Sequence, residues 1–479
     1  MRFRTVRTCF GVILRCRGTG IHLGESSERP VPLLAVPIDL PPDVVELRSG
    51  DVDADGQDEL IAVSHKDRGN APKAVTVTVF HLDQQGTVER QWSANLKNTP
   101  LVLDVEAGLW AQGPKGIMQV TEDGVRLAAE ARTALSGLGR TTPIFANVFV
   151  DIEGDGVPET ILSNGRVLRI LSADGTERGQ IPIRGQGELS TRVMGGIKVV
   201  AASVSPSWWV DDFNGDGFGD VLVSEGKTLT VYPVTAEGLQ PKQTVMLPVD
   251  VSPKDRDWTG KKGETKKRAI SVWLEDLDGD GLTDFTAQLW VTKGSWMGSE
   301  GELVFAKGTG AGFGAPQRMV SENAVVMVRL IDLDGDGDKE LAAAEIDFGV
   351  GNLTRALVSQ KIRVDLVYRA MTDGRYGDVQ DLHSVVVPVG SRNRDSSDEL
   401  NSDLTGDGVP DLVTTEGGES IQILKGTGTG FEGKPTATLD VGFDQSEDKL
   451  WVGDLTGDGR AEIVVWRPEG RSAKVLQLQ

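Results

Sequence analysis

The chain has 479 residues, 71 acidic against 50 basic side chains, and a formal net charge of −21. This acidic balance disfavours a nucleic-acid partner, because binding to phosphates needs a basic surface. Both cysteines, Cys9 and Cys16, lie near the start of the chain, so disulfides do not join the rest of it, and no stretch approaches the roughly 20 apolar residues of a transmembrane segment.

The amino-terminal segment begins with basic residues, as a secretory signal does. Its apolar run, from Cys9 to Leu14, is shorter than the roughly 7–15 residues of such a signal, and no small-residue cleavage site follows it. We therefore expect residues 1–28 to be a leader or disordered segment and residues 29–479 to form the folded body.

The first predicted strand, residues 31–40, has no hairpin partner near it in the sequence. Residues 60–63 and 74–81 are the next predicted strands. The second of these has a period of two, with Val alternating with Thr. Later parts of the chain show similar short runs separated by Gly, Asp and Asn turn signals. In the most compact group the predicted strands are 148–150, 160–162, 166–171 and 179–183.

A nine-residue pattern occurs seven times, each time just before a predicted strand. Positions 1 and 5 are Asp, position 6 is Gly, position 9 is Asp or Glu, and position 3 always offers a side-chain oxygen. Alternating oxygen donors, a glycine at a sharp turn and a closing carboxylate suit a hard cation such as Ca²⁺, whereas Mg²⁺ prefers few protein ligands and keeps its waters. We therefore predict about seven Ca²⁺ sites.

Each predicted site uses the side chains of positions 1, 3, 5 and 9 and the backbone carbonyl of position 7. The ligands are, loop by loop, Asp51, Asp53, Asp55, Gln57 and Glu59; Asp151, Glu153, Asp155, Val157 and Glu159; Asp212, Asn214, Asp216, Phe218 and Asp220; Asp276, Asp278, Asp280, Leu282 and Asp284; Asp332, Asp334, Asp336, Asp338 and Glu340; Asp403, Thr405, Asp407, Val409 and Asp411; and Asp454, Thr456, Asp458, Arg460 and Glu462. The loops with Asn214, Thr405 and Thr456 have one carboxylate fewer, so we expect weaker binding there.

Two other interpretations of the pattern are possible. An EF-hand needs a Glu at position 12 and flanking helices, but position 12 is never acidic here and the flanks are β-branched. A single Asp/Gly-rich turn between strands usually binds nothing. Seven copies with the same residue classes favour metal binding over that alternative.

The repeats predict a β-propeller. Residues 101–108 keep Asp104 and Glu106 of the pattern but have Gly108 where Asp is needed, which indicates an eighth unit without metal. The eight units open at intervals of 47 to 71 residues, and four-stranded units of this size are typical of propeller blades. Independent sandwiches are disfavoured because each unit is too small to bury its own core. We predict an all-β fold of eight blades, or seven if one unit is an insertion.

The two ends of the chain are predicted to complete one sheet. Only two strands, 462–466 and 473–479, follow the last loop, while residues 31–40 form a strand without a sheet. Pairing them would remove two open strand edges and close the ring.

Two segments interrupt the repeats. Residues 251–268 are rich in Lys and Arg, which indicates a solvated loop, with capture of an anionic partner as the alternative. Residues 353–360 predict two helical turns before a strand at 362–368.

Two further stretches carry a family resemblance. Gly308-Thr-Gly-Ala-Gly-Phe-Gly-Ala-Pro316 and Gly426-Thr-Gly-Thr-Gly-Phe431 each follow a strand that comes after a D-x-D-x-D-G loop. With these stretches and the loops before them, roughly residues 40–479 resemble the FG-GAP/VCBS repeat family. The resemblance implies a propeller like the head of integrin α-subunits, with calcium loops between the first two strands of a blade, on one face, and partners commonly on the other.

Two functions remain open from the sequence. The first is a calcium-stabilised, monomeric binding or adhesion scaffold with a protein or glycan ligand; the alternative is a secreted polysaccharide lyase or hydrolase. An enzyme needs acid, base or nucleophile at one place. The four histidines have no metal-ligand spacing and no nucleophile elbow or P-loop is present, so we assign no catalytic residue. Calcium loops of modest affinity would fill only outside the cytosol, so we expect an extracytoplasmic location.

Overall fold

The computed structural model describes residues 33–478 with gaps. The gaps are residues 54, 66–74, 97–101, 106–107, 114–115, 131–143, 146–148, 156–157, 164–166, 173–174, 184–185, 194–196, 205–206, 252–264, 294–299, 360, 389–397, 415–419, 441, 443–447 and 469. The expected leader, residues 1–28, and most of the basic segment therefore lie outside the described residues.

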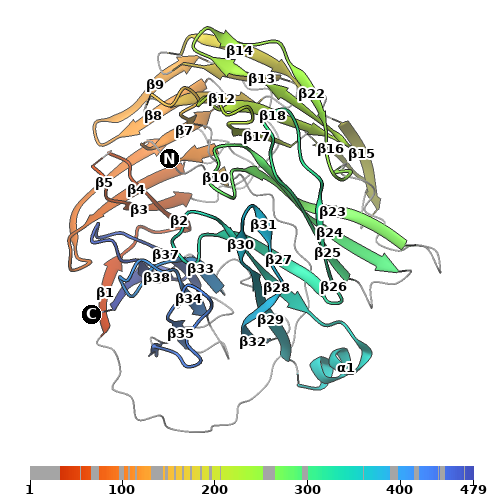
Figure 1. Cartoon of the computed structure of the whole chain (residues 1–479). Helices are drawn as coiled ribbons and strands as arrows, with labels where there is room; N and C mark the ends of the chain where they lie inside the picture. Colours follow the sequence, from red (N-terminus) through yellow and green to blue (C-terminus); the bar gives the residue numbers. More distant parts are fainter. Residues whose placement is uncertain are drawn as a thin grey trace.

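The described chain is a ring of eight four-stranded antiparallel blades, which confirms the all-β propeller and the count of eight (Figure 1). The first four blades are β2 (Val44–Gly50), β3 (Glu59–His65), β4 (Val75–Leu82) and β5 (Val88–Leu96); β6 (Val102–Asp104), β7 (Trp110–Gly113), β8 (Gly116–Thr121) and β9 (Gly124–Glu130); β11 (Phe149–Val150), β12 (Glu159–Ser163), β13 (Val167–Leu171) and β14 (Glu177–Pro182); and β17 (Trp208–Asp211), β18 (Asp220–Glu225), β19 (Thr228–Tyr232) and β22 (Gln243–Met246).

The other four blades complete the ring. They are β23 (Thr265–Glu275), β24 (Asp284–Lys293), β25 (Glu300–Ala306) and β26 (Gln317–Ser321); β27 (Ala324–Ile331), β28 (Glu340–Ile346), β29 (Lys361–Arg369) and β32 (Gln380–Pro388); β33 (Asp398–Ser402), β34 (Asp411–Thr414), β35 (Ile421–Leu424) and β36 (Ala437–Leu439); and β37 (Lys449–Gly453), β38 (Glu462–Trp466), β39 (Ser472–Leu478) and β1 (Leu33–Asp39). Blades are numbered 1 to 8 in this order.

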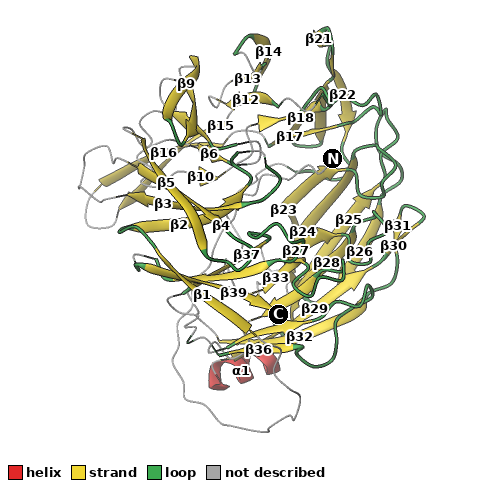
Figure 2. Cartoon of the chain, turned by 90° about the vertical axis from the view of Figure 1, so that its left-hand side faces the viewer, coloured by secondary structure: helices red, strands yellow, loops and turns green. Residues whose placement is uncertain are grey.

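Several elements are added to the regular blades. They are β10 (Ile144–Phe145), parallel to β6; the hairpin β15 (Gln186–Val193) and β16 (Ile197–Val204) between blades 3 and 4; the small hairpins β20 (Val234–Thr235) with β21 (Gly238–Leu239) and β30 (Met371–Thr372) with β31 (Arg375–Tyr376); and α1 (Val350–Ser359). The helix lies where two turns were expected and is the one helix among the described residues (Figure 2). It is too short to cross a membrane.

The apolar core is divided among the eight blade interfaces. In β4, alternate residues face opposite neighbours: Val77 and Val79 pack with blade 2, and Phe80 and Leu82 pack with blade 8. This is why the strands carry apolar residues on both faces, since a sheet between two others has no wet face. Each of the eight apolar clusters joins two adjacent blades, so no described blade holds a core of its own.

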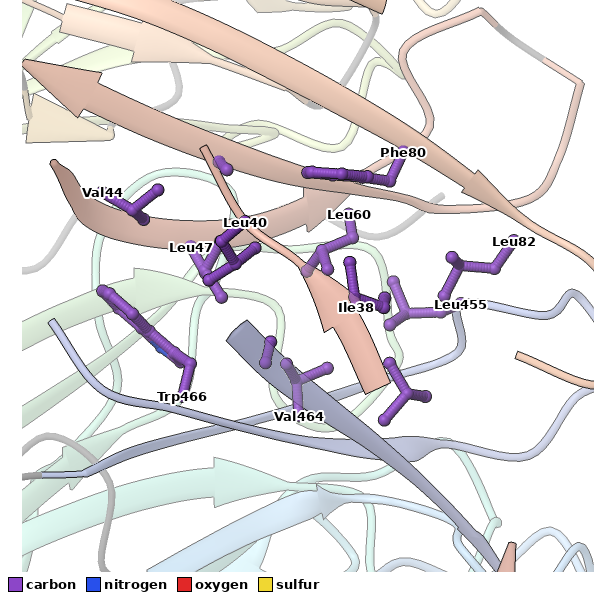
Figure 3. Packing of buried hydrophobic residues seen from close by; sticks show 13 residues of the cluster. Ile38, Leu40, Val44, Leu47, Leu60, Phe80, Leu82, Leu455, Val464 and Trp466 are labelled. Atoms are coloured by element: carbon purple, nitrogen blue, oxygen red, sulfur yellow. The ribbon is translucent and has the colours of Figure 1, made fainter. Parts of the chain in front are cut away.

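The two ends of the chain meet in blade 8. β1 pairs antiparallel with β39 along its whole length, from Leu33 opposite Leu478 to Asp39 opposite Ser472. Figure 1 shows β1 beside the C-terminus. In Figure 3, Ile38 lies between the residues of blade 1 and those of the last two strands. The strand at the amino-terminal end thus supplies the fourth strand of the last sheet.

If this pairing holds the ring together, Ile38→Ala should lower the free energy of unfolding by about 2–5 kcal/mol, because it removes volume from a closely packed interface. Ile38 is only 1% exposed. Chemical denaturation at a fixed calcium concentration measures the effect. The exposed neighbour gives a control, since Asp39→Ala should change the value by no more than about 0.5 kcal/mol. Equally small effects for both variants would contradict a structural role for β1.

Candidate metal centres

The seven loops join the first and second strands of every blade except blade 2. Four of the loops are bonded through their backbone to the preceding loop around the ring. The position-8 N–H donates to a carbonyl of the preceding loop in four cases: Gly219 to Ile152 at 2.7 Å, Thr283 to Asp212 at 3.0 Å, Lys339 to Leu277 at 2.7 Å and Ala461 to Asp403 at 2.7 Å. The loop 403–411 has Pro410 at this position, which has no N–H to donate.

The last loop also contacts the first. Gln57 Nε2 donates to the carbonyl of Leu455 at 2.9 Å, and also to that of Leu82 at 2.8 Å. Gln57 was assigned only a backbone role from the sequence. Its side chain instead links blade 1 to the last loop, so the loops form a band at one end of the ring.

Within each loop the first carboxylate organises the backbone. Asp212 Oδ1 accepts from the N–H of Gly215 at 2.7 Å, and its Oδ2 accepts from the N–H of Gly217 at 2.8 Å. Gly217 has a φ of 87°, a left-handed conformation that favours glycine. Asp216 Oδ1 in turn accepts from the N–H of Phe218 at 3.0 Å. The Asp, Asp and Gly of the repeated pattern therefore fold the loop by themselves, before any cation is considered.

The position-9 carboxylate is a second structural element, and the sequence did not reveal this role. Asp284 is fully buried; its Oδ2 accepts from the N–H of Leu277 at 3.1 Å and its Oδ1 from that of Gly308 at 2.6 Å. The first contact closes the loop and the second fastens it to the end of β25. Equivalent pairs are Glu340 with Leu333 and Met371, and Asp411 with Leu404 and Gly426.

Burial makes the charged form of these position-9 carboxylates unfavourable. Burial, with added repulsion from carboxylates of the same loop, raises the pKa of Glu59 to about 8 and the pKa of Asp220, Asp284 and Glu462 to about 7. The pKa values of Glu159, Glu340 and Asp411 are raised by burial as well. A nearby cation would favour the charged forms and reverse this direction.

Some predicted ligand oxygens lie together without a hydrogen-bond partner. Asp276, Asp278 and Asp284 each offer an oxygen within 4.8 Å of the others, and the buried Oδ1 atoms of Asp276 and Asp278 accept no hydrogen bond. The same clustering occurs for the carboxylates of positions 1, 3 and 5 in the loops 51–59 and 332–340. An all-oxygen donor set fits Ca²⁺. Ligation stays a prediction at all seven loops, and Val157 lies outside the described residues.

The loop 51–59 contains a histidine contact that the sequence did not indicate. His81 Nδ1 lies 3.1 Å from Glu59 Oε1, while its Nε2 faces two donors, Trp92 Nε1 at 3.2 Å and Arg90 Nη2 at 2.8 Å. Nε2 is therefore an acceptor, so the proton of the neutral ring lies on Nδ1 and is donated to Glu59. Burial lowers the pKa of His81, which favours this neutral form. The histidine thus supports the loop rather than offering a lone pair to a metal.

Blade 2 keeps only part of the repeated pattern between its first two strands. Asp104 survives from the pattern, and its Oδ2 accepts from the N–H of Phe149 at 3.1 Å, which ties blade 2 to blade 3. The N–H of Gly108, four residues further along the chain, donates to the carbonyl of Asp51 at 3.3 Å. Glu106 lies outside the described residues. The retained Asp104 therefore has a structural contact in this unit.

Comparisons with known proteins agree with the repeat pattern. A family model described as an FG-GAP-like repeat matches residues 403–465, which include both of the last two loops. No curated protein matches the chain. One similar solved structure is that of the V. cholerae biofilm matrix protein Bap1, with 13% identity over 92% of this chain and 88% of that chain, and a TM-score of 0.27. This score supports no inference about function.

The role of the position-9 carboxylate is tested by Asp284→Ala in the presence of EDTA, where no metal contributes. The variant leaves two buried backbone N–H groups without an acceptor, and each costs about 1–3 kcal/mol. We expect a clear fall in the denaturation midpoint. Asp280→Ala removes a more exposed carboxylate of the same loop and should have a smaller effect. Equal effects would show that Asp284 does not fasten the loop.

Proposed function

We propose that this chain, a β-propeller of FG-GAP-like repeats, is a calcium-stabilised binding scaffold that works outside the cytoplasm. The band of seven acidic loops at one end of the ring carries the proposal. Positions 1, 3, 5 and 9 of each loop hold three or four carboxylates, and the closing carboxylate at position 9 is buried. Two like charges 4 Å apart repel by about 1 kcal/mol even in bulk water, so such a band needs counter-charge.

The residues of the loops fit Ca²⁺ in a definite way. The carboxylate oxygens of positions 1 and 5 that hold backbone N–H groups keep lone pairs for a cation, as does the position-9 carboxylate. Position 3 is the donor least used by the loop backbone, and Asp278 Oδ1 accepts no hydrogen bond. With the position-7 carbonyl, this set would place five to seven oxygens about 2.3–2.6 Å from the ion. Calcium would supply charge here and no bond-breaking chemistry.

The energetic contribution of calcium depends on its concentration. Modest sites have dissociation constants near 10⁻⁴–10⁻³ M, and at about millimolar calcium each contributes roughly 0.4–1.4 kcal/mol. Seven sites would add on the order of 3–10 kcal/mol, comparable to the stability of a whole domain. At the far lower calcium level of the cytosol the sites would be empty. This is the basis for proposing a secreted, periplasmic or cell-surface location.

A rigid ring presents fixed surfaces to a partner, which suits a scaffold function. The loop face is occupied by carboxylates and cations, so the opposite face and the blade edges remain for a protein or glycan ligand. We propose such binding by a monomer, without a catalytic step. Of the unassigned acids, Glu264 lies outside the described residues, and Glu300 and Glu345 do not form a group with a histidine among the metal-type clusters of the described residues.

Removal of calcium is the direct test of this proposal. The purified chain should carry about seven calcium ions by elemental analysis after dialysis against millimolar calcium. EDTA should lower its melting temperature by roughly 3–10 °C, because about 3–10 kcal/mol are lost and 1 kcal/mol corresponds to about 1 °C in a chain of 479 residues. Magnesium in place of calcium gives the control and should restore little.

The opposite pattern would favour the alternative function. If EDTA left the melting temperature unchanged but abolished the depolymerisation of a uronate polymer, the metal would serve catalysis instead of stability. The scaffold proposal would then be wrong, and the chain would be a polysaccharide-active enzyme.

A further inference from the structure

Four of the seven loops have a basic side chain of the protein bonded to a predicted ligand. The pairs are Arg90 with Asp53, Arg178 with Glu153, Lys307 with Asp278 and Asp280, and Lys425 with Asp407. No ion pair between described residues involves a predicted ligand of the loops 212–220, 332–340 or 454–462. We call these three the open loops. The seven predicted sites thus divide into four with a basic side chain bonded to a ligand and three without one among the described residues.

Lys307 shows the arrangement most fully. It follows β25 directly and precedes Gly308, whose N–H holds Asp284. Its Nζ bonds to the carboxylate of Asp278 and lies 3.0 Å from Asp280 Oδ2. Asp278 is only 3% exposed. The ammonium therefore offsets one of the two negative charges of positions 3 and 5, which are both predicted calcium ligands.

The next blade covers this ion pair. The turn between β30 and β31 passes over it at Gly374, where a Cβ atom would lie 2.5 Å from Asp278 Oδ2 and 3.1 Å from Lys307 Nζ. Asp373 and Gly374 both have positive φ angles, of 51° and 66°, as a tight hairpin turn requires. The carboxylate of Asp278 is buried although the Lys307 side chain is 42% exposed, so water screens this contact less than it screens a salt bridge between two exposed side chains.

Lys425 occupies the same place in its repeat. It follows β35 and precedes Gly426, whose N–H holds Asp411. Its Nζ lies 2.9 Å from Asp407 Oδ2, and position 3 of this loop is the uncharged Thr405. Lys425 bonds to one carboxylate, which is 34% exposed, whereas Lys307 bonds to two, one of them only 3% exposed, so the contact of Lys425 with its loop is weaker.

An ammonium group and a calcium ion compete when they need the same carboxylates. We propose that Lys307 and Lys425 are built-in counter-cations, so that the open loops take up calcium first and the loops 276–284 and 403–411 follow at higher concentration. This inference rests on the proposed calcium binding. It also reverses one ranking from the sequence, because the loop 276–284 has four carboxylates but should bind more weakly than the loop 212–220.

The counter-cation has opposite effects in the two states of a loop. Without calcium it offsets repulsion between carboxylates and stabilises the fold. With calcium present it must be displaced, so it weakens binding. Removing the lysine should therefore lower the stability of the calcium-free chain and raise calcium affinity, a combination that simple damage to the fold does not produce.

Lys307→Met in the full chain tests this directly by equilibrium dialysis at buffered free calcium. The wild type should bind about three ions in its tighter class, and the variant about four. The affected site should bind about tenfold tighter, as expected for loss of one charge-assisted hydrogen bond to the competing cation. The variant should also melt at a lower temperature than the wild type in EDTA. Lys425→Met should shift one further site by a smaller factor, and it is the safer variant if Lys307→Met folds poorly, because its partner Asp407 is 34% exposed whereas Asp278 is 3% exposed.

Two variants serve as matched controls. Lys449→Met removes the same charge from an ion pair with Glu46, away from all predicted ligands, and should leave calcium binding unchanged. Ala370→Lys places an ammonium at the equivalent position of the open loop 332–340, since Met371 N–H holds Glu340 there, and should weaken one tight site. Seven calcium ions bound with the same affinities in all variants would overturn the counter-cation proposal alone. No calcium bound to the wild type would overturn the proposed function as well.

Discussion

Each blade of this propeller has two apolar faces, and neither can be left in water. A four-stranded sheet of about 50 residues is too small to bury a core by itself, so every face must be covered by a neighbouring blade. The eight apolar clusters lie at the eight interfaces, including the one between blades 8 and 1. A closed ring leaves no blade face exposed, and the pairing of β1 with β39 completes the last blade of the ring.

The same constraint brings the acidic loops together. Because the blades are packed side by side in one orientation, their loops meet at one end, and four of them bond through the backbone to the preceding loop. This concentrates carboxylates, several of them buried, in a narrow band. The folded ring therefore needs positive charge near these carboxylates. Basic side chains such as Lys307 supply part of it, and in our proposal bound calcium supplies the rest. A rigid ring held in this way suits a binding scaffold.

Much of the fold could be predicted from the sequence because local signals encode it. Alternating or β-branched runs placed most strands, and β38, at Glu462–Trp466, lies where the sequence predicts it. The hairpin of β15 and β16 was not predicted, because it lies between two units and leaves no mark on the repeat interval. The contacts of Asp284 with Gly308 and of Lys307 with Asp278 were also missed, since both join segments more than 20 residues apart that only the folded blade brings together.

The central claim is that the loops hold calcium. The most direct measurement is anomalous scattering from crystals grown in millimolar calcium, which locates each ion independently of stability or activity. Our account predicts peaks about 2.3–2.6 Å from the ligand oxygens, strongest in the open loops 212–220, 332–340 and 454–462. Well-ordered open loops without anomalous peaks would contradict it.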